Sequence, residues 1–223
     1  MKSLATTLLL TISLSFSCFS QNLTSEEILN KAIAYHDPNG EWNSFAYRLF
    51  FDQDLPDGSI SKEIVELNNA TSYFKAKRQK NEVEFGLNKD SCFVISTKKL
   101  PCERITMMRN YYLYLWGLPM KLKDPGTNLD AKVREGKFGN TDCYILRVPY
   151  EKDIWYFYFD KASFAMKGYE FFKDEAKRIG ERIELTGEFS VGNMKLPQNR
   201  KWNNTHDQQY LATDKLVKAE KLD

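Results

Sequence analysis

The stretch at residues 45–51 reads Phe-Ala-Tyr-Arg-Leu-Phe-Phe, and it decides the fold class. Every second residue, from Phe45 to Phe51, is large and apolar. Side chains at this period point to one face of an extended chain, and aromatic residues favour strands. The stretch therefore predicts a β-strand with one apolar face.

Similar strand patterns follow along the chain. They cover residues 60–67, 72–78, 83–87, 92–96, 143–148, 154–159, 164–172, 179–189 and 194–202, with another strand beginning near Ala131. Short strands separated by turns predict an antiparallel meander of about ten or eleven strands. The run Trp155-Tyr-Phe-Tyr-Phe159 is apolar on both faces, which predicts a strand buried on both sides. We expect the charged end, residues 215–223, to be frayed.

Two helices complete the predicted fold, which is mainly β. Thr24-Ser-Glu-Glu27 is a capping box, and the helix behind it is expected to run to about Tyr35. The second helix is predicted over Pro101–Trp116 and interrupts the meander. It is apolar nearly all round, so it must be covered on several sides or line an apolar space.

Six side chains of this second helix are the candidate ligand-binding residues. Four of them repeat at helical spacing and two adjoin the stripe: Ile105, Met108, Tyr112 and Leu115, with Met107 and Tyr111. Methionine adapts to ligands of varied shape, and aromatic rings supply broad apolar contact. Ordinary core packing would explain the same stripe.

The first twenty residues have the layout of a secretory signal peptide. Met1-Lys2 is basic, residues 4–16 carry no charge, and Cys18-Phe19-Ser20 precedes Gln21. We therefore expect residues 1–20 to be removed and residues 21–223 to form a single domain, exported to the periplasm. The alternative is a lipoprotein anchored through Cys18, because the small Ser17 precedes that cysteine.

The net charge limits the classes of partner that the sequence predicts, and the cysteines raise the question of a disulfide. The formal net charge is +2, which gives no general attraction to nucleic acid, so no nucleic-acid partner is expected. Cys92 and Cys102 lie close in sequence in a chain expected to be exported, which leaves open a disulfide or two free thiols. Cys143 sits at a buried position of a strand pattern, where inert packing is expected.

Motifs for catalysis are scarce. The sequence has no nucleophile elbow, zinc-protease motif, P-loop or dinucleotide fingerprint. His36 and His206 are its two histidines, and each precedes an aspartate at the end of an expected element. A turn or capping role fits these His-Asp pairs better than a metal site. The sequence thus predicts no cofactor, no metal and no enzymatic activity, with a hydrolase as a remote alternative.

The order of elements resembles a known fold. A capped helix, then Ser44-Phe-Ala-Tyr-Arg-Leu-Phe50, then a meander broken by an apolar helix is similar to the periplasmic lipoprotein carriers of the LolA/LolB type. This resemblance implies an incomplete antiparallel barrel that wraps helices and leaves an apolar cavity for acyl chains.

A closer resemblance is to an uncharacterised family of exported bacterial proteins with the same fold. It is carried by four places in the chain: Tyr35-His-Asp-Pro-Asn-Gly-Glu-Trp42, Gly117-Leu-Pro-Met-Lys-Leu-Lys-Asp-Pro-Gly126, Trp155-Tyr-Phe-Tyr-Phe-Asp160, and Lys201-Trp202 with Tyr210-Leu-Ala-Thr-Asp214. This family brings no established activity. The function expected is binding of a lipid, a lipoprotein acyl chain or another apolar ligand. The alternative is a structural or interaction module, with a filled core, that contacts an outer-membrane or other envelope protein.

Overall fold

A computed structural model describes residues 23–80, 82–96 and 99–222. The helices are α1 Ser25–His36 and α2 Cys102–Trp116, with the short 3₁₀ helices η1 Glu41–Ser44 and η2 Met120–Lys123. The strands are β1 Ala46–Asp54, β2 Ile60–Asn68, β3 Tyr73–Arg78, β4 Val83–Asn88, β5 Ser91–Ile95, β6 Arg134–Phe138, β7 Thr141–Pro149, β8 Ile154–Asp160, β9 Met166–Asp174, β10 Ile179–Val191, β11 Met194–Asn204 and β12 Tyr210–Lys221.

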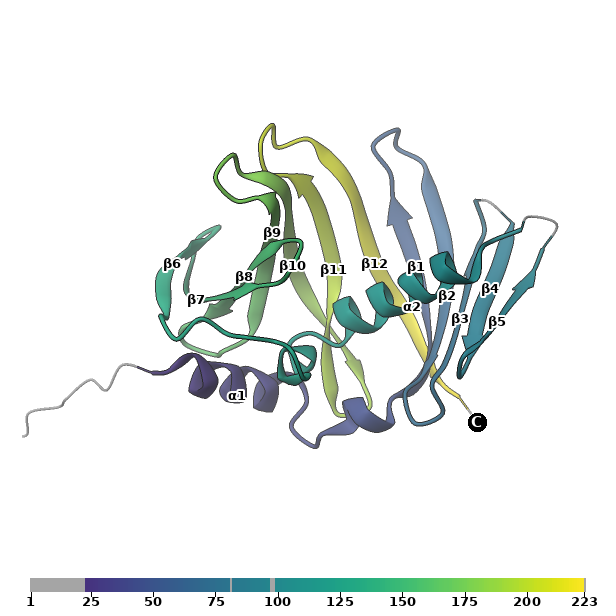
Figure 1. Cartoon of the computed structure of the whole chain (residues 1–223), viewed down its shortest axis with the longest axis horizontal. Helices are drawn as coiled ribbons and strands as arrows, with labels where there is room; N and C mark the ends of the chain where they lie inside the picture. The colour runs from purple at the N-terminus through teal and green to yellow at the C-terminus, as the bar shows by residue number, and fades with distance from the viewer. Residues whose placement is uncertain (1–22, 81, 97–98, 223) are drawn as a thin grey trace, which may run out of the picture.

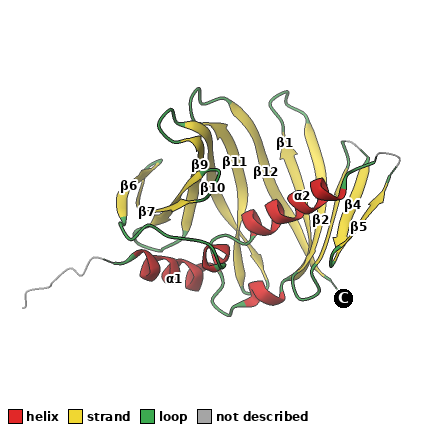
Figure 2. Cartoon of the chain, in the orientation of Figure 1, coloured by secondary structure: helices red, strands yellow, loops and turns green. Residues whose placement is uncertain are grey.

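All the strands form one antiparallel sheet that curves but does not close (Figure 1). Its order is β5-β4-β3-β2-β1-β12-β11-β10-β9-β8-β7-β6, so β5 and β6 lie at opposite ends. Figure 2 shows the helices on one side of this curved sheet. The prediction of an incomplete antiparallel barrel over two helices is confirmed, with twelve strands in place of about ten or eleven.

Two apolar clusters line the concave side of the sheet. One joins β1–β5 to α2 through Ile105, Met108 and Tyr112. The other joins β7–β11 to α1, and Leu115 of α2 belongs to it. Helix α2 therefore packs against both halves of the sheet.

Strand β8 is buried on both faces, as its sequence predicts. Phe157 and Phe159 have no exposed surface on the concave side. On the outer face Tyr158 packs with Phe138 and Cys143, which is the buried free thiol that the sequence analysis expects.

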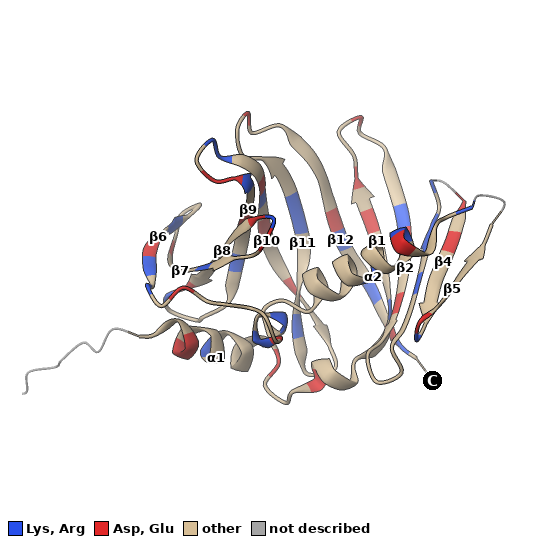
Figure 3. Ribbon diagram, viewed as in Figure 1, with Lys and Arg blue, Asp and Glu red and all other residues tan. Residues whose placement is uncertain are grey.

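Charged side chains of the outer face pair across strands, and Figure 3 marks where acidic and basic residues lie along the ribbon. The carboxylate of Glu66, on β2, lies 2.8 Å from Arg48 Nε on β1 and 3.1 Å from Lys75 Nζ on β3. Glu170 is likewise contacted by Arg182 at 2.8 Å and by the Tyr158 hydroxyl at 2.7 Å. These two buried carboxylates are thus satisfied by neighbouring strands.

The first His-Asp pair fixes the end of α1 to the sheet. His36 is 5% exposed, its Nδ1 lies 2.7 Å from the Lys195 carbonyl, and its Nε2 accepts from the Met166 amide at 2.9 Å. These contacts require a neutral ring with its hydrogen on Nδ1. Asp37 accepts from the amides of Glu41 and Trp42, which is the capping role that its sequence position suggests.

The C-terminal segment is not frayed, and this prediction is wrong. Residues 210–221 form β12, which lies between β1 and β11 in the middle of the sheet. Leu216 is fully buried. The charges that suggested a frayed end are paired with another strand, since Lys215 contacts Asp54 and Glu220 contacts Arg48.

The two cysteines whose pairing the sequence left open form a disulfide. Cys92 lies on β5 and Cys102 begins α2, and their Cα atoms are 5.6 Å apart. The bond ties an edge strand to the start of the central helix.

We predict that His36 makes stability depend on pH. Burial lowers the pKa of this imidazole from its ordinary value of about 6.5. The unfolded chain therefore binds more protons just below that pH. The stability that the neutral His36 ring contributes is fully present above about pH 6.5. It is lost as the pH falls toward the pKa of His36 in the folded state. Chemical denaturation between about pH 7.5 and pH 5 should show a smaller pH dependence for His36→Gln than for the wild type; parallel curves would contradict this role.

We predict that Leu216 holds the middle of the sheet. Leu216→Ala should lower the free energy of unfolding by about 2–5 kcal/mol, because it leaves a cavity in a packed core. Val217→Ala is the matched control: Val217 is 49% exposed, and its loss should cost less than about 1 kcal/mol. Urea denaturation measures both values. If both substitutions lower the free energy of unfolding by equal, small amounts, the expectation that residues 215–223 are frayed would hold after all.

Candidate functional site

Helix α2 lies across the concave side of the sheet and carries all six candidate residues (Figure 1). Four are buried: Ile105, Met108, Tyr112 and Leu115. Met107 and Tyr111 are 57% and 49% exposed. Pro101 is the N-cap of the helix and Gly117 its C-cap, at the ends that the sequence predicts.

A cavity of about 420 Å³, named here the Tyr111 cavity, lies between one flank of α2 and the sheet. Three candidate residues line it: Tyr111, Tyr112 and Leu115. Ile105 and Met108 instead pack in the core of the β1–β5 half. Met107 lies outside the lining. The structure thus brings half of the candidate set to one cavity.

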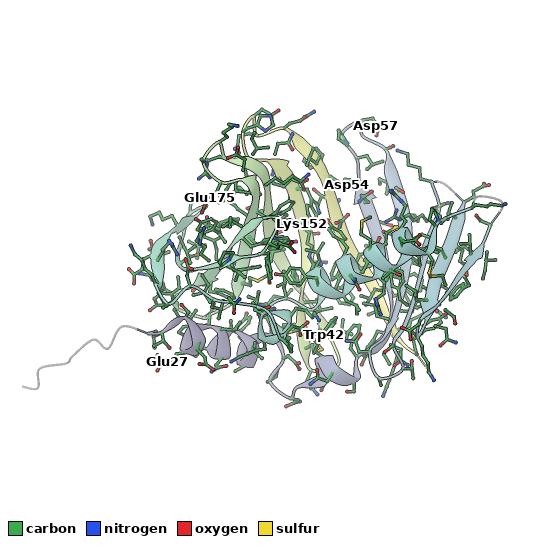
Figure 4. All side chains as sticks on the ribbon, in the orientation of Figure 1. Glu27, Trp42, Asp54, Asp57, Lys152 and Glu175 are labelled. Carbon is green, nitrogen blue, oxygen red and sulfur yellow. A yellow bond between two sulfur atoms is a disulfide. The ribbon has the colours of Figure 1, made fainter. Side chains whose placement is uncertain are left out.

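The strands supply most of the remaining wall. Among the residues that line it are Phe51, Glu63, Arg78, Glu181, Arg200 and Trp202. The ring of Tyr111 stacks on that of Trp202, with 6.3 Å between centroids. Gln53 and Ser61 flank the β1–β2 hairpin, which is marked by Asp54 and Asp57 in Figure 4. The cavity therefore lies toward the hairpin end of β1 and β2.

Arg200 is the unusual group of the cavity. It lies on β11 and is 1% exposed, and its guanidinium carbon is 3.3 Å from the centroid of the Trp116 ring. Its Nη2 donates to the Leu115 carbonyl at 2.8 Å, while Nε and Nη1 have no partner among the described residues. Burial lowers the pKa of this guanidinium. The buried side of the cavity thus holds a cation with unused donors.

Three other charged groups of the cavity, Glu63, Arg78 and Asp214, have hydrogen-bond partners in its wall. Glu63 accepts from Arg78 Nε at 2.6 Å, and Arg78 Nη2 donates to the Tyr112 hydroxyl at 3.0 Å. Asp214 accepts from Gln53 at 2.7 Å and from the indole of Trp202 at 2.8 Å. Burial raises the pKa of Glu181. These pairs leave Arg200 without a carboxylate in contact.

Arg200 and Trp202 are not among the site residues that the sequence pattern predicts. A local signal exists, because Leu196, Arg200 and Trp202 occupy buried positions of one alternating strand. A charge at a position where the period predicts an apolar residue marks a possible site. That pattern does not show which helix the Arg200 side chain would face.

Within the described residues, no group of three or more His, Cys, Asp or Glu could hold a metal ion. His36 is occupied by its two structural hydrogen bonds, and His206 lies on the turn before β12, next to Asp207. None of the helices in the described part of the chain has the length and apolar character needed to cross a membrane.

Among the solved structures that share this fold are two bacterial proteins. A LolA superfamily protein from Nitrosomonas europaea is 11% identical with a TM-score of 0.57, over 91% of this chain and 95% of that one. A putative outer membrane lipoprotein-sorting protein domain from Vibrio parahaemolyticus is 9% identical with a TM-score of 0.50, over 87% and 91% of the two chains. The resemblance to the LolA-type fold is confirmed at the level of architecture.

Comparison of the sequence with family models identifies an uncharacterised family. No curated protein matches this chain significantly. The model of one family, described as a family of unknown function, matches residues 5–219, nearly the whole sequence. The chain therefore belongs to the family of unknown function DUF6503.

Proposed function

We propose that this chain is a non-enzymatic, exported protein of the cell envelope that binds a lipid or acyl chain in the Tyr111 cavity. One observation carries the proposal: beside α2 an unfilled space is bordered by aromatic rings and by a buried cation with unused donors. A filled core would leave neither the space nor the unused donors.

The size and walls of the cavity fit an amphipathic ligand. Its volume of about 420 Å³ falls within the range of roughly 300–1,000 Å³ typical of small-molecule sites. An apolar chain beside Tyr111, Leu115 and Trp202 would gain about 0.8 kcal/mol for each buried CH₂ group. A carboxylate or ester oxygen would lie on the Arg200 side of the cavity, where the positive charge of the buried guanidinium attracts it.

Export is supported by the leader and by the disulfide. The signal-peptide pattern at residues 1–20 lies outside the described residues. The Cys92–Cys102 bond is independent support, because disulfides persist mainly in oxidising compartments such as the periplasm.

The test is a fluorescent fatty-acid displacement assay on paired variants. Tyr111→Asp places a carboxylate at the cavity wall, on a side chain exposed enough to avoid a buried charge. We expect it to weaken acyl binding about tenfold or more, since it removes an aromatic contact and repels an acidic head group. Met107→Asp, on the same helix but outside the cavity, is the matched control and should bind like the wild type.

Two results would reject the proposal. One is wild-type protein that binds no acyl probe and yields no lipid when it is purified from its native envelope and extracted for mass spectrometry. The other is an equal loss in Met107→Asp and Tyr111→Asp, which would show that the probe binds to exposed surface. The first result would favour an interaction module.

A further inference from the structure

A second cavity, of about 510 Å³, lies on the opposite flank of α2 and is named here the Arg109 cavity. Its walls include Arg109 and Leu113 from α2, Trp42 from η1, Asn68 from the end of β2, and Lys121 and Lys123 from η2. Figure 4 labels Trp42 at the end of the sheet away from Asp54 and Asp57. The two cavities thus lie toward opposite ends of the strands.

Helix geometry separates the two cavities. Arg109 and Leu113 are four residues apart, so they lie above one another on one flank of α2. Tyr111 and Leu115 have the same spacing and lie on the other flank. A substitution on one flank therefore tests one cavity at a time.

Arg109 is a cation without a partner in this cavity. Its Nε is shielded from solvent and has no hydrogen-bond acceptor. No ion pair or ring contact to its guanidinium is present among the described residues. Arg109 as a whole is half-buried, and a buried donor such as its Nε is costly when it has no acceptor.

The acidic groups that line this cavity or contact its lysines are already engaged. Asp124 pairs with Lys121, and Glu26 lies 3.2 Å from Lys123. Asp37 accepts two amide hydrogens at 2.7 and 3.0 Å. The lysine pairs are partly exposed, and such pairs are weak enough to exchange for another anion. Figure 3 shows the blue of η2 between the two helices.

We propose that the Arg109 cavity binds a phosphate group, with Arg109 as its main contact and Lys121 and Lys123 as supporting cations. A guanidinium matches phosphate with two parallel hydrogen bonds, and several cations suit its charge better than that of one carboxylate. The apolar wall of Trp42, Leu113 and Met120 would accept an apolar part of the same molecule. This proposal uses a different cavity from the acyl-chain proposal and does not rest on it.

The experiment is isothermal titration of the full chain with inorganic phosphate and with dihexanoyl phosphatidic acid, a short-chain lipid below its micelle concentration. Arg109→Gln removes the cation, and Arg109→Lys keeps the charge but removes the planar fork. Arg104→Gln, at an exposed position of the same helix, is the matched control. We expect wild-type protein to bind both probes, Arg109→Gln to bind about tenfold to a hundredfold more weakly, and Arg104→Gln to be unchanged.

The outcomes separate the source of the phosphate and the role of Arg109. Tighter binding of the lipid identifies a lipid head group, and equal affinity identifies free phosphate; both support the site. Weaker binding by a folded Arg109→Lys variant also supports the phosphate site. If Arg109→Gln does not fold, the result with Arg109→Lys takes its place as the test. Wild-type protein that binds neither probe overturns the proposal, as does an equal loss in Arg104→Gln.

Discussion

The backbone ladder of β12 joins the two halves of this molecule. Residues 213–221 pair with β1, and residues 210–215 pair with β11. Without this strand the sheet would separate into β1–β5 and β6–β11, and the apolar cluster that joins β1–β5 to β10 and β11 would be divided. Each half would then expose an edge of unpaired amides and carbonyls, which costs free energy and invites association. The position of α2 depends on this joint, because the helix packs on both clusters.

The open ends of the sheet explain why helices occupy its concave side. A closed barrel of about eight strands is filled by its own side chains, but this sheet has twelve strands and its ends, β5 and β6, remain apart. Helix α1 covers the β7–β11 half, and α2 covers the β1–β5 half and reaches Leu115 into the other. A cylinder laid on a curved sheet fills the middle of the contact better than its flanks. The two cavities lie at those flanks, one on each side of α2.

Local patterns in the sequence predicted most elements but not the contacts between distant ones. Alternation identified β1 and β8, and the capping box identified α1, because these signals are contained within a few residues. Strand β12 was missed because its charges look solvated until Lys215 meets Asp54 and Glu220 meets Arg48 from β1. The apolar stripe of α2 predicted a covered helix. Which of its residues face a cavity depends on the strands packed against α2, and these are distant in sequence. Arg200 became part of the site for the same reason, since 85 residues separate it from Leu115.

The distribution of unpaired polar atoms argues against a purely structural α2. In the described part of the chain, four buried side-chain atoms lack a hydrogen-bond partner: Arg109 Nε, Arg200 Nε and Nη1, and the Tyr169 hydroxyl. Arg109 belongs to α2, and Arg200 contacts Leu115 and Trp116. Elsewhere buried charges are satisfied, as Glu66 and Glu170 are by neighbouring strands. A helix selected only for packing would be met by apolar side chains, because replacing an unpaired buried charge by an apolar group gains stability. Unused donors beside two cavities are the observation on which both binding proposals rest.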